Sequence, residues 1–231
     1  MGENIMSSHQ DSRAGAKTYT PAVLFFYDFL VFKFNGPILW GVTTKHLLGL
    51  YNQHISEDHL DIGVGTGYFL DKCIFPGASP RICLMDLNES SLRHTAKRIS
   101  RYHPKTVVGD ALLPLPFEDN RFGSIGMNSL LHCMPGDLSK KSVVFDHAAR
   151  CLIPGGVVFG ATVLNIQDKM NWLAKRVFSD FNKKGIFCNQ EDSLETLESE
   201  LSRRFDDVRI SMKGVAALFS GKRRVDPNKN V

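Results

Sequence analysis

From residue 59 onward, the sequence alternates short apolar runs with amphipathic helical patterns. The runs lie at 59–63, 81–87, 105–110, 121–128 and 155–164, and those at 81–87 and 155–164 are apolar on both faces. Helical spacing of apolar residues lies between them, at 66–74, 88–103 and 137–152. Strands that are apolar on both faces must be covered on both sides. The alternation therefore predicts an α/β fold with a doubly wound, mostly parallel sheet and helices on both faces.

The last part of the chain departs from this alternation. Leu194, Leu197 and Leu201 are in line on a helix predicted over 192–205. The segments 206–214 and 215–223 follow with only a short connection, which indicates an antiparallel pair at the sheet edge. We expect a single folded domain over 19–221, between a flexible arm at 1–18 and a basic tail at 222–231.

Composition excludes several classes of function. The formal net charge is only +4, and the last eleven residues hold four basic side chains against one acid, which argues against a nucleic-acid-binding face. The five cysteines have no CxxC or Cys/His spacing, so we expect reduced thiols in a cytoplasmic protein and no metal site. Residues 21–42 form the most apolar stretch, but Asp28, Lys33 and Pro37 interrupt it, and no membrane span is expected.

Three glycines stand at every second position after the first predicted strand, in "HLDIGVGTGYFLD". Gly63, Gly65 and Gly67 allow a sharp turn and a close approach of the backbone to a ligand. A tight strand-to-helix turn needs glycine even when nothing binds, so the loop alone leaves both interpretations open. Asp86 ends the second strand, nineteen residues past Gly67, where an acid commonly accepts hydrogen bonds from ribose hydroxyls. It could instead cap the following helix, although Asn88 suits that position better.

The spacing of these glycines narrows the class of ligand. A dinucleotide fingerprint reads G-x-G-x-x-G, whereas Tyr68 stands here at the last position, and no Gly-Lys-Ser/Thr follows as in a P-loop. The pattern favours a nucleoside ligand.

Over residues 58–164 the chain resembles the class I S-adenosylmethionine-dependent methyltransferases. "LDIGVGTGYF", "CLMDLN", "VGDALLPLPFEDNRFGSI", "IGMNSLLHCMPG" and "CLIPGGVVFGATVL" follow the order and spacing of that family's motifs. The resemblance implies a seven-stranded sheet of order 3-2-1-4-5-7-6 with the last strand antiparallel, and a helical lid. It also implies S-adenosylmethionine as cofactor and S-adenosylhomocysteine as product.

The resemblance further assigns roles to single residues. Asp61 and the glycine backbone would hold the methionine part of the cofactor, Asp86 the ribose hydroxyls, and Asp110 the adenine amino group. Helices at 19–56 would cover the cofactor, and a lid insertion would lie at 165–190. The full set of expected cofactor-binding residues is Tyr19, Trp40, Asp61, Gly63, Gly65, Gly67, Asp86, Leu87, Asp110, Ala111, Asn128 and Ser129.

Catalytic residues are harder to assign, because the cofactor brings its own electrophilic methyl group. His132, just past the fourth strand, is the candidate general base, although a histidine there could simply pack or cap the next segment. Tyr27 is a second candidate, and Asp137 is expected to be a helix N-cap.

The acceptor pocket is expected from segments outside the motifs. Eight aromatic residues lie between Tyr19 and Trp40, and lid residues recur at helical spacing, namely Met170, Leu173, Val177 and Phe181. Both sets could instead be ordinary core, and we favour that for Phe25, Phe29 and Phe32. An aromatic, apolar pocket suits a hydrophobic or aromatic small molecule. The Asn-Pro-Pro-Tyr/Phe signature of enzymes that act on nucleic-acid bases and glutamine is missing.

Three functions remain open from the sequence. The chain resembles most the ubiquinone-biosynthesis-like and secondary-metabolite methyltransferases, so methylation of a small molecule in natural-product biosynthesis is the leading hypothesis. A cyclase that binds the cofactor without methylating is the second, and a non-catalytic partner-binding member is the third. We expect a monomer or a homodimer.

Overall fold

The computed structural model describes residues 37–225. The expected arm at 1–18, residues 19–36 of the expected cap helices and residues 226–231 of the basic tail lie outside the described residues. Tyr19 and Tyr27 are among the residues outside, so their predicted roles stay predictions.

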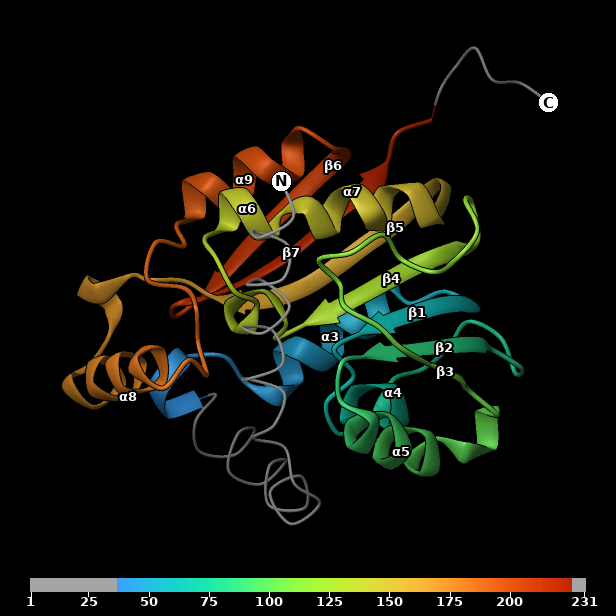
Figure 1. Ribbon diagram of the computed structural model, residues 1–231, viewed down its shortest axis with the longest axis horizontal. Helices are drawn as coiled ribbons and strands as arrows, with labels where there is room; N and C mark the ends of the chain where they lie inside the picture. Colours follow the sequence, from blue (N-terminus) through green and yellow to red (C-terminus); the bar gives the residue numbers. More distant parts are fainter. Residues whose placement is uncertain (1–36, 226–231) are drawn as a thin grey trace, which may run out of the picture.

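A seven-stranded sheet forms the centre of the protein, in the order β3-β2-β1-β4-β5-β7-β6 (Figure 1). The first five strands run parallel, whereas β7 is antiparallel to both β5 and β6. Both the predicted order and the antiparallel last strand are confirmed. The strands are β1 (Asp58–Ile62), β2 (Arg81–Asp86), β3 (Lys105–Val108), β4 (Phe122–Asn128), β5 (Leu152–Val163), β6 (Phe205–Lys213) and β7 (Ala216–Arg223).

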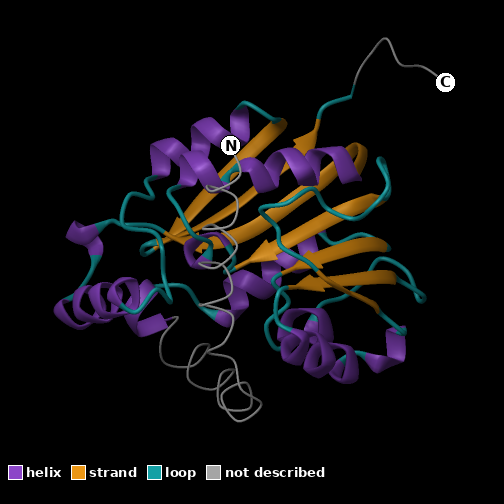
Figure 2. Cartoon of the chain, in the orientation of Figure 1, coloured by secondary structure: helices purple, strands orange, loops and turns teal. Residues whose placement is uncertain are grey.

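Helices cover both faces of this sheet and bury a separate core on each (Figure 2). One face is covered by α3 (Thr44–His54), α4 (Tyr68–Lys72) and α5 (Glu89–Arg98). The other face is covered by α6 (Leu138–Lys141), α7 (Val143–Cys151) and α9 (Leu194–Ser202). Short 3-10 turns lie at Ser100–Tyr102, Leu131–Cys133 and Gln167–Lys169. The two-sided cover agrees with strands that are apolar on both faces.

Local capping fixes the start of two helices. Asn88 accepts hydrogen bonds from the backbone N–H groups of Ser90 and Ser91 and is the N-cap of α5. Asp137 accepts one from the N–H of Lys140 and is the N-cap of α6. Both predicted N-caps are confirmed, because each side-chain oxygen satisfies an N–H that has no partner inside the helix.

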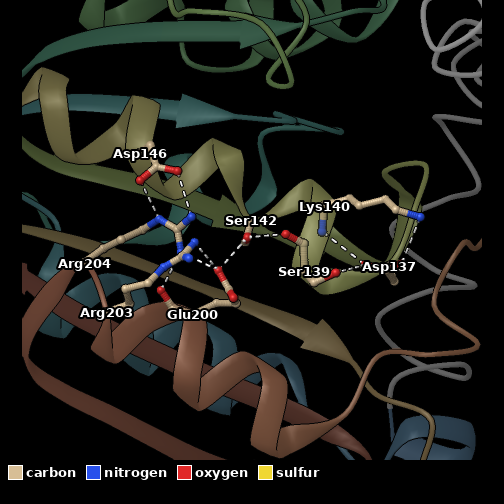
Figure 3. A network of polar contacts seen from close by, with 8 residues as sticks. All are labelled: Asp137, Ser139, Lys140, Ser142, Asp146, Glu200, Arg203 and Arg204. Carbon is tan, nitrogen blue, oxygen red and sulfur yellow. Dashed lines mark hydrogen bonds and ion pairs between the residues drawn. The ribbon is translucent and has the colours of Figure 1, made fainter. Parts of the chain in front are cut away.

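The single helix predicted over 137–152 is wrong, because α6 and α7 are separate helices that meet at Ser142. The Ser142 hydroxyl lies 2.8 Å from Glu200 Oε2, on α9. Arg204 donates to both carboxylate oxygens of Asp146 on α7 at 2.7 Å, and its Nη1 reaches Glu200 as well (Figure 3). This polar cluster fastens α9 to α6 and α7, two helices that precede β5 in the chain.

A helical segment follows β5, within the residues 165–190 where the lid insertion is expected. It holds α8 (Trp172–Lys183), which lies beside residues 37–41 (Figure 1). Asn171, the N-cap of α8, also donates from Nδ2 to the carbonyl of Ile38 at 3.2 Å. Of the predicted apolar stripe, Met170, Val177 and Phe181 pack into the core on the α3 side, whereas Leu173 is 38% exposed.

β7 ends at Arg223, which is also the last residue of the segment expected to form it, 215–223. Lys222 and Arg223 therefore belong to the sheet, although the basic tail is also expected to start at residue 222. Among residues 37–225, no helix has the length and apolar character that crossing a membrane requires.

The close packing of the sheet gives a test of the fold. A Cβ added at Gly160 on β5 would collide with the carbonyl oxygen of Met127 and come 2.8 Å from Phe219 Cζ. We expect Gly160→Ala to lower the free energy of unfolding by roughly 1–3 kcal/mol, because neither neighbour can move cheaply. The melting temperature should fall by roughly 2–4 °C for each kcal/mol.

Gly49→Ala is the matched control. Gly49 lies on the exposed side of α3, and a Cβ there would meet nothing within 4 Å. Because alanine favours the helix, this variant should gain about 1 kcal/mol. Equal melting temperatures for the two variants would contradict the packing of β5 between β4 and β7.

Candidate active site

The glycine loop leaves β1 in a conformation that suits glycine alone. Gly63, Gly65 and Gly67 all have left-handed φ angles, at 74°, 52° and 71°. A Cβ on Gly67 would lie 2.6 Å from Thr95 Cγ2, so helix packing also requires glycine at that position. A Cβ on Gly65 would meet nothing within 4 Å, and this is the side of the loop that a ligand can approach.

Two side chains of helix α5 donate hydrogen bonds to the backbone carbonyl groups of the glycine loop. Thr95 Oγ1 donates to the carbonyl of Gly65 at 3.1 Å, and Arg98 Nη1 donates to the carbonyl of Thr66 at 3.1 Å. Sequence reasoning missed both residues, because in the sequence they are ordinary members of an amphipathic helix. The loop is therefore held in its shape before any ligand binds.

Asp86, at the end of β2, lies against the same loop. Its carboxylate accepts hydrogen bonds from the backbone N–H groups of Asn88, at 2.8 Å, and of Val64 and Gly65. Burial nevertheless raises the pKa of Asp86 to about 6, because desolvation of the charged form outweighs these donors. Leu87 follows it and is half-buried.

Asp110 and Ala111 follow β3, the next strand along this edge. Asp110 Oδ1 accepts from the N–H of Leu112 at 2.9 Å, which fixes the turn after the strand. Ala111 is buried, and its carbonyl lies 3.2 Å from His147 Nδ1.

Asn128 and Ser129 lie at the end of β4. Asn128 Oδ1 is buried with no hydrogen-bond partner among the described residues. A buried acceptor without a donor is rare and marks a place where a ligand N–H or O–H can bind. Ser129 has a left-handed φ of 59°, unusual for a residue with a side chain, and its N–H donates to the carbonyl of Ala161 at 2.8 Å.

His132 is buried just beyond the end of β4. The backbone N–H of Val163 donates to His132 Nδ1 at 3.2 Å, and Thr162 Oγ1 lies 3.3 Å from the same atom. An N–H can only donate, so Nδ1 keeps its lone pair and the proton of the neutral ring is on Nε2. Burial, with a smaller contribution from the nearby Lys141 ammonium, lowers the pKa of His132 to about 3.

An aromatic cluster surrounds this histidine. The His132 and Phe187 ring centroids are 4.5 Å apart, and those of Trp40 and Phe187 are 5.7 Å apart. The carbonyl of Trp40 accepts from the N–H of Val215, which ties the segment before α3 to the start of β7. Trp40 thus lies with the aromatic residues next to His132. Phe187 was not singled out from the sequence, although it lies in the expected lid segment at 165–190, because it stands outside every motif.

Asp61, the acid before the glycines, is also buried. Its Oδ2 accepts from the Tyr51 hydroxyl at 2.8 Å and lies 3.4 Å from His59 Nε2. Neither Tyr51 nor His59 was predicted, because tyrosine and histidine at these positions form no motif.

The sheet brings the predicted polar residues to one edge. Asp61, Asp86, Asp110 and Asn128 stand at or just past the carboxyl ends of β1, β2, β3 and β4, which lie side by side in the sheet. Gly65 has open space where a Cβ would stand, and Asn128 Oδ1 is a buried acceptor without a donor among the described residues. These groups fit a nucleoside cofactor, whose hydroxyl and amino groups are donors.

Comparison with known proteins agrees with a site for a nucleoside cofactor. Residues 60–160 match the family described as Methyltransferase domain. The chain is 40% identical to the demethylluteothin O-methyltransferase of Streptomyces thioluteus over 209 residues, which cover 90% of each chain. It is 36% identical to the physcion biosynthesis cluster O-methyltransferase of Aspergillus chevalieri, over 89% of this chain and 93% of the relative.

Solved structures share the fold. The N-methyltransferase NodS from Bradyrhizobium japonicum, solved in complex with S-adenosylhomocysteine, superimposes with a TM-score of 0.56 at 17% identity. The match covers 78% of this chain and 84% of that protein.

The burial of His132 predicts how stability depends on pH. In the unfolded chain the ring binds a proton near its ordinary pKa of about 6.5, whereas the folded protein resists protonation down to about 3. The contribution of His132 to stability is therefore complete above about pH 6.5 and is lost progressively as the pH falls toward 3. We expect the stability difference between wild type and His132→Asn to shrink from pH 7 to pH 4, measured by urea unfolding.

Stability is compared with that of His132→Asn because Asp86 contributes to the stability of both proteins with the opposite pH dependence. Its raised pKa makes its contribution to stability largest at low pH, and that contribution is lost as the pH rises through about 6. His103→Asn, at an exposed position, is the control for loss of a histidine as such. Parallel curves for wild type and His132→Asn would contradict the burial of this ring.

Proposed function

Because the chain belongs to the S-adenosylmethionine-dependent methyltransferases, we propose that it methylates a hydroxyl group of a hydrophobic or aromatic small molecule in natural-product biosynthesis. We choose oxygen as the acceptor atom because the chain is 40% identical to demethylluteothin O-methyltransferase over 90% of both chains. The physcion relative supports the same chemistry. The relatives do not favour the cyclase or the partner-binding alternative.

We propose that the cofactor binds along the carboxyl edge of β1 to β4. Asp86 would accept from the ribose hydroxyls, Asp110 from the adenine amino group, and Asp61 from the amino-acid part. The free Oδ1 of Asn128 and the open side of Gly65 support this placement. When bound, the cofactor supplies an electrophilic methyl group, so the task of the protein is to orient the acceptor and exclude water.

His132 is the described residue that we propose to contact the acceptor. No described residue hydrogen-bonds its Nε2, and the lone pair on Nδ1 is already used by the Val163 amide. This tautomer supports a neutral N–H donor that orients an acceptor oxygen. The general-base role predicted from the sequence requires the ring to take up a proton, and its low pKa opposes that uptake.

The apolar surroundings support an apolar acceptor. Trp40, Phe187 and the buried residues of α8 lie on the side of the sheet where His132 is found. Tyr27, a cytoplasmic location, a monomeric or homodimeric state and the domain boundaries stay predictions.

The pKa of Asp86 gives a test of the cofactor site. The carboxylate is the form that accepts from two hydroxyls, and its pKa in the free protein is about 6. We therefore expect the affinity for S-adenosylhomocysteine, measured by calorimetry, to fall as the pH is lowered below about 6. Asp86→Asn should bind about tenfold more weakly at pH 8 and lose most of this pH dependence.

Leu87→Ala is a useful companion, because it alters the neighbouring side chain without removing the charge. It should weaken binding by a similar factor at every pH. If Asp86→Asn kept the wild-type pH dependence, another group would be responsible for it.

The proposed reaction is tested by supplying acceptors of different chemistry. Phenols and enols of natural-product type, and matched amines, are incubated with S-adenosylmethionine, and the products are located by mass spectrometry and NMR. We expect O-methylation with one S-adenosylhomocysteine released for each product. His132→Asn should lower turnover by about tenfold or more while changing the affinity for S-adenosylhomocysteine less than about threefold.

Three outcomes would contradict the proposal. Methylation of nitrogen alone would contradict the proposal that the acceptor atom is oxygen. Conversion of a substrate without release of S-adenosylhomocysteine would indicate a cyclase. Full turnover of His132→Asn over the whole pH range would remove the proposed role of this residue.

A further inference from the structure

A row of buried polar groups runs beneath the cofactor edge, between α3, β1 and β4. Tyr51 on α3, His59 and Asp61 on β1, and Ser124 on β4 are each no more than 3% exposed. His59 Nδ1 lies 2.8 Å from Ser124 Oγ, and His59 Nε2 lies 3.4 Å from Asp61 Oδ2. The Tyr51 hydroxyl reaches the same Asp61 oxygen at 2.8 Å. The row thus links the amino-terminal half of β1 to the acid that precedes the glycine loop.

The hydrogen bonds of this row all lead toward the carboxylate of Asp61. A carboxylate can only accept, so His59 Nε2 carries a proton and donates it to Asp61. Nδ1 of the neutral ring then accepts from the Ser124 hydroxyl at 2.8 Å, while Ser124 Oγ accepts from the N–H of Ser56 at 2.8 Å and lies 2.9 Å from Ser56 Oγ. Burial and the neighbouring Asp61 charge raise the pKa of Tyr51 well above its usual range, so this hydroxyl also remains a donor. Two donors from two different elements therefore meet on one oxygen of Asp61.

Strand β4 leaves space for this row. Gly126 is paired with Asp61 in the sheet, and a Cβ there would lie 3.0 Å from Asp61 Oδ2 and 3.3 Å from His59 Nε2. Gly123 stands on the other side of Ser124, and a Cβ there would lie 2.7 Å from Ser56 Oγ. A side chain at position 126 would therefore press against both members of the His59–Asp61 contact.

Aromatic rings enclose the row. Phe159 on β5 stacks against His59 with ring centroids 5.8 Å apart and meets the edge of Tyr51 at 5.1 Å. Both donors to Asp61 are therefore fixed by packing as well as by hydrogen bonds. Asp61 Oδ1 accepts no hydrogen bond from the described residues, and it is not among the fully buried atoms that lack a partner.

We propose that His59 and Tyr51 are positioning residues, which hold Asp61 by Oδ2 so that Oδ1 receives the ammonium group of the amino-acid part of the cofactor. This proposal rests on the proposed role of Asp61 in binding that part. A carboxylate with one oxygen held cannot rotate away from the loop, so the ammonium meets an acceptor that is already in place. The row therefore recognises the amino-acid part and leaves binding of the nucleoside part to Asp86 and Asp110.

The test compares two ligands that differ in this part alone. S-adenosylhomocysteine carries the ammonium and carboxylate groups, whereas 5′-methylthioadenosine keeps the nucleoside and the sulfur but lacks both. Dissociation constants of both ligands are measured by calorimetry. In His59→Asn the amide stands near the Nδ1 position and cannot reach Asp61. We expect it to bind S-adenosylhomocysteine about tenfold more weakly and 5′-methylthioadenosine within about twofold of wild type.

His59→Gln is the matched control, because its amide nitrogen can stand near the Nε2 position and still donate to Asp61. It should keep the affinity for S-adenosylhomocysteine within about threefold of wild type. Tyr51→Phe removes the other donor from a different element while keeping the ring packing. It should show the same selective loss as His59→Asn, so the test holds even if one variant folds poorly.

The outcomes separate positioning from a structural role. Equal loss of affinity for both ligands in His59→Asn and Tyr51→Phe would show that the row only supports the fold, and would overturn the proposal. Asp61→Asn tests the premise: if it leaves the ratio of the two dissociation constants unchanged, the role of Asp61 in cofactor binding fails. If Asp61→Asn changes the ratio and the other two variants do not, only the positioning fails.

Discussion

The carboxylate of Asp86 and the backbone of the glycine loop depend on each other. The N–H groups of Val64 and Gly65 donate to the carboxylate of Asp86, which is half-buried and has its charged form stabilised by these donors. Their contact joins the end of β2 to the end of β1 and fixes the shape of the loop. Thr95 and Arg98 secure the loop carbonyls from the other side. The cofactor edge is thus a network of satisfied backbone groups, with the side of Gly65 left open.

The two faces of the sheet have different tasks. The face under α6, α7 and α9 is fastened by the Arg204 cluster over an aliphatic and aromatic core, and α6 also buries the Lys141–Asp192 ion pair. The face under α3 carries the polar row from Ser56 to Asp61. Polar groups that are buried and paired cost little when every member has a partner, and they impose a unique arrangement. The site is therefore supported from the α3 side, while the opposite side supplies rigidity.

Much of the fold was predictable because its signals are local. Strands that are apolar on both faces, the Asn88 and Asp137 caps and the glycine spacing each act within a few residues of the chain, and the structure contains all of them. The break at Ser142 was not predictable, because its hydroxyl meets Glu200, 58 residues away. The contact between Tyr51 and Asp61 is short in sequence, but it exists only because α3 packs on the sheet. The tautomer of His132 depends in the same way on the Val163 amide of a neighbouring strand.

The glycine at position 126 has a consequence for protein engineering. Design methods raise the stability of a sheet by filling strand positions with β-branched residues, and a central strand with glycines at 123 and 126 is an obvious target. At Gly126 the first carbon of such a side chain would lie 3.0 Å from Asp61 Oδ2 and 3.3 Å from His59 Nε2, so these side chains would have to shift. A redesigned β4 would then have a higher strand propensity and a displaced carboxylate at the cofactor edge, so a thermostability screen alone would select the wrong sequence.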